Sequence, residues 1–153
     1  MTSSIPDVAR YRRVAIWLFA VCALVFCMVV LGGVTRLTGS GLSMTDWRPV
    51  TGILPPLTAE AWAAEFASYQ ASPEFAKVNS HMDVEAFKGI FWLEYLHRLL
   101  GRLIGLAFFV PFVVFAWRGD IRPSEYPRYV VMFALGGMQG LLGWYMVKSG
   151  LVD

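Results

Sequence analysis

Three long apolar stretches alternate with polar segments along the chain. Residues 14–34 and 129–147 contain no charged side chain, and residues 89–117 are apolar throughout their second half. Each stretch approaches or exceeds the roughly 20 residues that a helix needs to cross a bilayer. The pattern predicts an all-α, polytopic membrane protein with three transmembrane helices, joined by an outer loop at residues 35–88 and an inner loop at residues 118–128.

The long loop at residues 35–88 is predicted to be ordered and to fold back over the outer ends of the helices. It carries Trp47 and a pair of consecutive prolines, which are unusual in a flexible linker. Asp83 is in a suitable place to cap the second span, which would then start near Val84.

A short helix is expected over residues 59–70, with Thr58 as its N-cap. Trp62, Phe66 and Tyr69 recur at the spacing of one helix face. Two interpretations stay open for this face: the helix lies on the bilayer interface, or it forms a lid over a cofactor.

Basic residues predict the orientation of the spans. They cluster before the first span and between the second and third: Arg10, Arg12, Arg13, Arg118, Arg122 and Arg128. Because short loops rich in Lys and Arg stay in the cytoplasm, both segments are placed inside, and residues 35–88 outside. The first residues resemble no organelle transit peptide, which favours a bacterial plasma (inner) membrane with a cytoplasmic N-terminus.

Composition supports the membrane assignment and excludes several classes. Hydrophobic residues make up 57% of the 153 residues and charged residues only 16%, against about 25% charged in an average soluble domain. This balance excludes a soluble enzyme and a disordered chain. The net charge of +2 is too small to indicate nucleic acid as a partner.

The candidate chemistry lies on the second span. On a helical wheel, four ionisable side chains and two glycines share one arc: Glu94, His97, Arg98, Gly101, Arg102 and Gly105. Ionisable residues inside a span are costly, so they indicate a functional site. The only other histidine, His81, is expected to be a solvated loop residue.

Two explanations of this arc are compatible with the spacing. In the first, the glycines admit a flat ligand, His97 ligates a metal and the arginines bind carboxylates, which together suit haem with its propionates. In the second, Glu94 and Arg98 form an ion pair and His97 hydrogen-bonds across helices.

At these residues the sequence resembles the haem A synthase family. The matching stretches are residues 32–43, 47–49, 52–56, 87–98 and 136–144, and the block Glu-x-x-His-Arg at residues 94–98 is the most specific of them. The resemblance implies a four-helix bundle that is half of an eight-helix protein made of two similar bundles. The chain supplies three of the four helices as an N-terminal half-domain, residues 1–153.

The resemblance also implies the reaction and the site. Family members oxidise the C8 methyl group of haem O to a formyl group, giving haem A for cytochrome c oxidase. His97 would be an axial ligand of the haem iron, and Glu94 would act catalytically beside the reacting methyl group. We add that Arg98 and Arg102 would anchor the propionates, with Gly101 and Gly105 against the macrocycle.

Further expectations follow from the same resemblance. A second axial histidine and a haem b site are expected beyond residue 153, so the residues in hand are not expected to catalyse the reaction alone. Haem O synthase, oxidase assembly factors and a second copy of the protein are the expected partners, besides the lipid bilayer. The alternative function is a non-catalytic haem-binding protein of electron transfer or respiratory-chain assembly.

Overall fold

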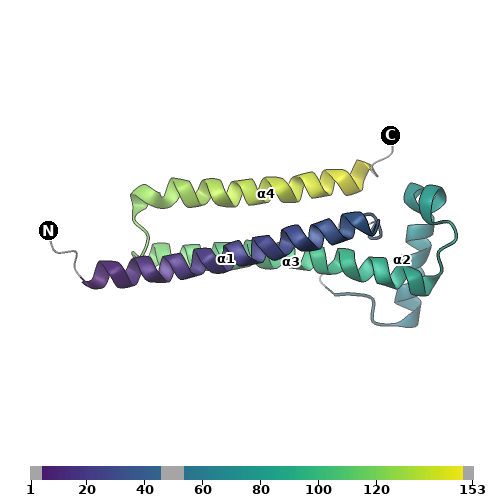
Figure 1. Ribbon diagram of the computed structural model, residues 1–153, viewed down its shortest axis with the longest axis horizontal. Helices are drawn as coiled ribbons and strands as arrows, with labels where there is room; N and C mark the ends of the chain where they lie inside the picture. The colour runs from purple at the N-terminus through teal and green to yellow at the C-terminus, as the bar shows by residue number, and fades with distance from the viewer. Residues whose placement is uncertain (1–4, 46–53, 150–153) are drawn as a thin grey trace. The chain divides into compact units, whose positions relative to one another are not determined.

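The computed structural model describes residues 5–45 and 54–149, and the described residues contain helices and no strand. The elements in chain order are α1 (Ile5–Leu37), α2 (Ala59–Gln70), the π-helical turn η2 (Phe75–Asn79), α3 (Val84–Trp117), the 3-10 turn η3 (Pro123–Glu125) and α4 (Tyr126–Ser149) (Figure 1). Three of them, α1, α3 and α4, are long and apolar enough to cross a membrane. The all-α prediction with three spans is confirmed.

The two predicted helix caps are present. Thr58 accepts a hydrogen bond from the backbone N–H of Ala61 at 3.2 Å, and α2 has the predicted bounds. Asp83 accepts from the N–H of Ala86 at 2.8 Å, so α3 begins at Val84, as the cap predicted. His81 is exposed in the turn before this cap, which confirms its expected place in a solvated loop.

Contacts divide the chain into two units, and the first joins the N-terminal part of α1 to residues 100–139. Its apolar core consists of Val14, Trp17, Val21, Phe108 and Ile121. The Trp17 ring stacks on Tyr129 of α4 with ring centres 5.8 Å apart. Aromatic packing of Trp17 therefore holds α1, α3 and α4 together in this unit.

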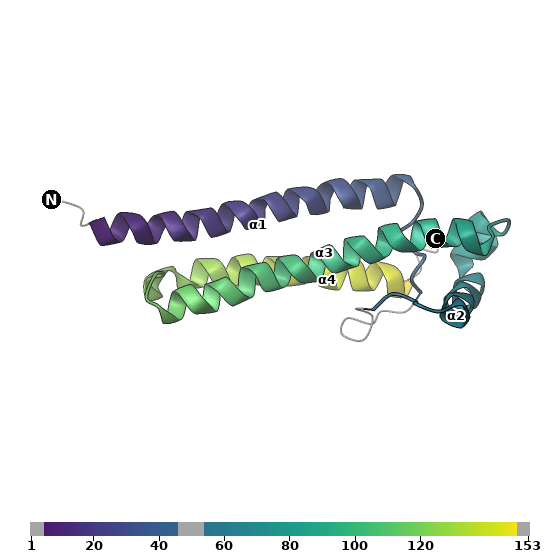
Figure 2. The ribbon, with the colours of Figure 1, turned by 90° about the horizontal axis from the view of Figure 1, so that it is seen from below.

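A charged contact lies at one end of the first unit. Gly119 adopts a left-handed conformation (φ 72°) and ends α3, so that Asp120 follows in a turn whose N–H donates to the Phe115 carbonyl at 2.8 Å. The buried carboxylate of Asp120 accepts a hydrogen bond from Arg13 at 2.6 Å. A short loop then leads into α4 (Figure 2). The N-terminal arginines and the α3–α4 loop thus lie at the same end of this unit.

The second unit contains residues 29–99 and the last part of α4. Its core is aromatic and consists of Tyr69, Phe87, Phe91 and Tyr95. The predicted face of α2 packs on the first turns of α3, because the rings of Trp62, Phe66 and Tyr69 all lie within 6.4 Å of Phe87. Figure 1 shows α2 lying across this end of α3.

The loop is therefore folded against α3, as expected for the part that the structure describes. Trp47, named in that prediction, lies outside the described residues. The apolar face of α2 is occupied by protein, which argues against a helix that rests on the bilayer through this face. Its role as a lid over a cofactor stays a prediction.

The end of α1 is shaped by Gly39, which has a φ of 63°. The N–H of Ser40 donates to the Thr35 carbonyl at 2.9 Å and that of Gly39 to the Arg36 carbonyl at 3.3 Å. This pair of bonds is a Schellman motif, which glycine permits because it has no Cβ. The chain is thereby turned back into a short segment, residues 40–45, that reaches α3.

Candidate functional site

The carboxylate of Glu94 is buried on α3, with 3% of the residue exposed. Its Oε1 accepts from Nε of Arg98 at 3.0 Å and from Nη2 of the same guanidinium. Its Oε2 accepts from the Ser43 hydroxyl at 2.7 Å and from the Met44 N–H at 2.8 Å. Each oxygen accepts two hydrogen bonds, an arrangement that suits an ionised carboxylate.

Arg98 joins the same network from one helical turn further along α3. Besides its ion pair with Glu94, its Nη2 donates to the Met44 carbonyl at 2.8 Å, and its side chain is 8% exposed. The turn at residues 40–45 and α3 are therefore tied together by buried charge-assisted hydrogen bonds. The ion pair of the second explanation is present.

His97 is half-buried and its ring faces the end of α1. A Cβ placed on Gly32 would lie 3.1 Å from Nε2 of His97, so the imidazole approaches α1 this closely because residue 32 is glycine. Among the described residues no hydrogen bond to His97 is found. The cross-helix bond of the second explanation is thus not seen there, and the imidazole nitrogens are not engaged by those side chains.

The metal-binding side chains near His97 suit haem better than a bare metal ion. Within residues 5–45 and 54–149, no group of three or more His, Cys, Asp and Glu side chains could hold a metal. Haem brings four ring nitrogens to its iron, so one protein imidazole is enough to add an axial ligand. His97 can provide that ligand.

The remaining predicted site residues, Gly101, Arg102 and Gly105, belong to the first unit. A Cβ on Gly101 would lie 3.4 Å from the terminal methyl of Met28, and a Cβ on Gly105 would meet nothing within 4 Å. Arg102 is half-buried there. The structure thus brings Glu94, His97 and Arg98 together within the second unit.

Sequence reasoning missed three contributors to the site: Gly32, Ser43 and the backbone of Met44. Gly32 belongs to α1, whereas Ser43 and Met44 belong to the turn that follows α1, within the predicted outer loop. Ser40 and Ser43 are 0% and 2% exposed, and a pair of serines in a glycine-rich turn could have signalled a buried polar contact. Its partner on α3 could not be read from the sequence.

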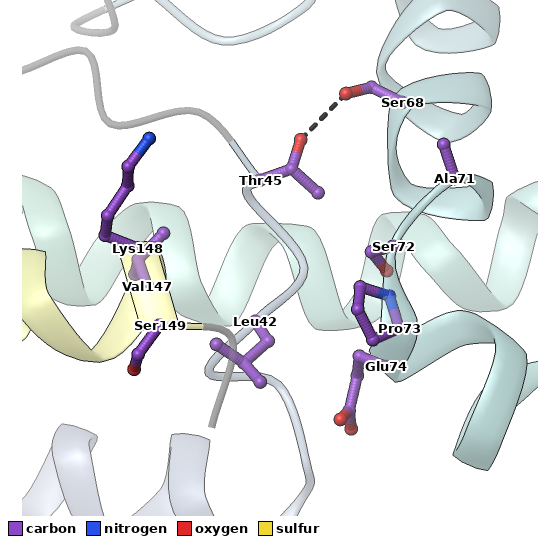
Figure 3. A pocket seen from close by; sticks show the side chains of 10 residues that line it. All are labelled: Leu42, Thr45, Ser68, Ala71, Ser72, Pro73, Glu74, Val147, Lys148 and Ser149. Carbon is purple, nitrogen blue, oxygen red and sulfur yellow. Dashed lines mark hydrogen bonds between the residues drawn. The ribbon is translucent and has the colours of Figure 1, made fainter. Parts of the chain in front are cut away.

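A pocket of about 290 Å³ lies elsewhere in the second unit, between the turn after α1, the end of α2 and the end of α4 (Figure 3). Thr45 and Ser68 line it, and their side-chain hydroxyls form a hydrogen bond with the two oxygens 2.7 Å apart. None of Glu94, His97 and Arg98 lines this pocket. It is separate from the candidate site.

Comparison with known families decides how the chain is classified. A family model described as cytochrome oxidase assembly protein matches residues 15–153. The chain belongs to this family. Family membership and three apolar helices make it a multi-pass membrane protein.

Relatives within the cytochrome oxidase assembly family are named haem A synthase, which confirms the predicted resemblance. The chain is 56% identical over 145 residues to the haem A synthase of Parvibaculum lavamentivorans. The aligned residues cover 95% of this chain and 42% of the relative. The haem A synthase of Azorhizobium caulinodans is 54% identical over 149 residues, which cover 97% of this chain and 43% of the relative. The chain thus spans about two fifths of the length of these relatives. No solved structure matches it.

Proposed function

We propose that this chain is the N-terminal half-domain of a haem A synthase and that its second unit holds part of the haem O site. The observation that carries the proposal is a buried carboxylate, Glu94, one helical turn from an imidazole, His97, on a membrane-spanning helix. Relatives more than half identical to the chain are named haem A synthase. An electron-transfer site needs the imidazole but has no use for such a carboxylate.

His97 is assigned as an axial ligand of the haem iron. Bound there, haem O supplies the methyl group that is oxidised to the formyl group of haem A. The half-buried imidazole supports this role, because no hydrogen bond from the described residues engages its nitrogens.

Glu94 is assigned the role of stabilising positive charge that develops on the substrate. A carboxylate beside the reacting methyl group could also take a proton or orient water. Four donors already occupy its oxygens. To accept a proton, Glu94 would have to release one of them, so the geometry favours a fixed negative charge over a base.

The arginines and glycines keep their proposed contacts with haem, with different degrees of support. The Arg98 guanidinium is engaged by Glu94 and by the Met44 carbonyl, and its propionate contact is proposed on its charge and position. Arg102, half-buried in the first unit, keeps its proposed propionate contact on its charge and its position in the sequence. Gly101 and Gly105 are proposed to face the macrocycle on the helical pattern alone.

The wider setting follows from the same proposal. We place the protein in a bacterial inner membrane with a cytoplasmic N-terminus, and the Arg13–Asp120 contact supports placing both basic segments on one side. The haem b site, a second copy, haem O synthase and oxidase assembly factors as partners stay predictions from the resemblance.

The test separates the two roles in the full-length protein, produced in a host that makes haem O but has no haem A synthase. His97→Ala is expected to lose haem from this half or to change its absorption spectrum. Glu94→Ala is expected to keep haem bound but to accumulate haem O or the intermediate alcohol. His81→Ala and Glu85→Ala are the controls, since both side chains are exposed. Normal haem A production by Glu94→Ala would refute the catalytic assignment.

Pigment extracted from the unmodified protein tests the alternative function. A mixture of haem O and haem A identifies the synthase. Haem b alone would identify a non-catalytic carrier of electrons or an assembly protein.

A further inference from the structure

Ser43 stands out among the groups around Glu94 because its hydroxyl reaches from the turn after α1 to the carboxylate on α3. Its residue is 2% exposed, and its Oγ lies 2.7 Å from Oε2 of Glu94. The same oxygen lies 3.1 Å from the Ser40 carbonyl and 3.3 Å from the Ile90 carbonyl. A hydroxyl has one proton to donate, and the carboxylate is both the nearest acceptor and the charged one.

The other donors to Glu94 differ from Ser43 in kind. Arg98 lies on the same helix, four residues away, so its contact with Glu94 does not depend on another segment of the chain. The Met44 donor is a backbone N–H, which only a substitution by proline would remove. Among the described residues, Ser43 is thus the side chain through which another segment of the chain directs Oε2.

The segment that carries Ser43 is itself held in place. The Schellman motif at Gly39 fixes the exit from α1, and the backbone N–H of Ser43 donates to the Ser40 carbonyl at 3.5 Å. A donor on such a preformed turn can orient a carboxylate without being rearranged during the reaction, which is the condition for effective electrostatic stabilisation.

We propose that Ser43 is a positioning residue for the Glu94 carboxylate, which it holds in the direction needed for oxidation of the bound substrate. The inference rests on the proposed function of Glu94. It adds a side chain from the turn after α1 to the candidate side chains of α3.

The first experiment measures pigments bound to the full-length protein in a host that makes haem O. Ser43→Ala is expected to lower the ratio of haem A to haem O about tenfold, the effect of one charge-assisted hydrogen bond. Total bound haem, its absorption spectrum and the protein level should stay unchanged, because His97 is untouched. Ser43→Thr keeps the hydroxyl and should restore most of the ratio.

Ser40→Ala is the matched control. Ser40 is a buried serine of the same turn, but its hydroxyl contacts Thr38 and not Glu94. A normal ratio in Ser40→Ala, together with a low one in Ser43→Ala, supports the positioning role. A normal ratio in Ser43→Ala, or an equal fall in both variants, overturns it.

A second measurement does not depend on haem A. Thermal unfolding of Ser43→Ala, Glu94→Gln and the double variant in detergent forms a double-mutant cycle. If the contact is as described, the double variant is destabilised by less than the sum of the single effects, whereas additive effects overturn the inference. Failure of the unmodified protein to produce haem A would instead refute the proposed function, whatever the cycle gives.

Discussion

The indole nitrogen of Trp17 donates a hydrogen bond of 2.7 Å to the backbone carbonyl of Ala107. That carbonyl lies four residues before Pro111, at the position whose acceptor an α-helix normally satisfies from residue 111. Proline has no N–H, so α3 cannot supply the donor itself. Trp17 of α1 therefore satisfies the one carbonyl that Pro111 deprives of its helical partner, which explains why α3 continues through a proline.

Trp17→Phe is predicted to destabilise the protein by about 1–3 kcal/mol, the range for leaving a carbonyl without a donor in an apolar setting. Unfolding in detergent measures the change. Trp117→Phe is the control, since Trp117 is 88% exposed.

The proline offers a second check of this bond. In a Pro111→Ala background the N–H of residue 111 is restored, and Trp17→Phe should then cost at least about 1 kcal/mol less. An equal cost in both backgrounds would show that Trp17 acts through ring packing alone.

Gly32→Ala is predicted to disturb His97, because the new Cβ would lie 3.1 Å from Nε2. The ring must then move, and the absorption spectrum of haem bound in this half should shift or its occupancy fall. Gly33→Ala is the matched control, since a Cβ there meets nothing within 4 Å. Identical spectra for the two variants would contradict the placement of His97 against α1.

The topology predicts that the α2 segment faces the outside of the cell. After the exposed native Cys22 and Cys27 are replaced by alanine, Ser68→Cys should react with an impermeant maleimide on intact spheroplasts. Ser124→Cys, in the loop that carries the Arg13 contact partner Asp120, should react only after permeabilisation. The reverse pattern would invert the orientation.

The packing of α2 is predicted to weaken at strongly alkaline pH through Tyr69. Burial raises the pKa of Tyr69 above its ordinary value of 10.0, and the hydrogen bond from Asn79 opposes this only in part. The neutral phenol thus stabilises the fold fully below about pH 10, and the contribution is lost as the pH rises through the higher folded pKa. Comparing tyrosinate absorbance of the protein and of Tyr69→Phe isolates this phenol. Ionisation at or below pH 10 would contradict its burial.

Much of the helical framework could be predicted from the sequence because its causes are local. Apolar runs of bilayer length predict spans, and Thr58 and Asp83 mark the starts of α2 and α3, since a cap bonds only to N–H groups within its own first turn. The helices α1 and α4 extend beyond the predicted spans, to Ile5 and Ser149. Hydropathy shows which part of a helix is apolar, whereas the helical backbone hydrogen bonds continue into the polar residues that flank it.

The ionisable residues on one face of α3 could also be predicted from local sequence, because a period of 3.6 residues decides which side chains share a face. That periodicity places Glu94 beside His97 and Arg98, and the ion pair within the arc is present. It leaves open what approaches the arc from elsewhere in the chain.

The sequence by itself therefore determined the spans, the caps and the polar face of α3. Only the tertiary structure decided the partners of that face: the Ser43 hydroxyl on Glu94, from 51 residues away, and Gly32 against His97. The same holds for Trp17 and Ala107, 90 residues apart. Such contacts depend on how loops close and helices pack, and no local period or propensity specifies which distant donor meets a given acceptor.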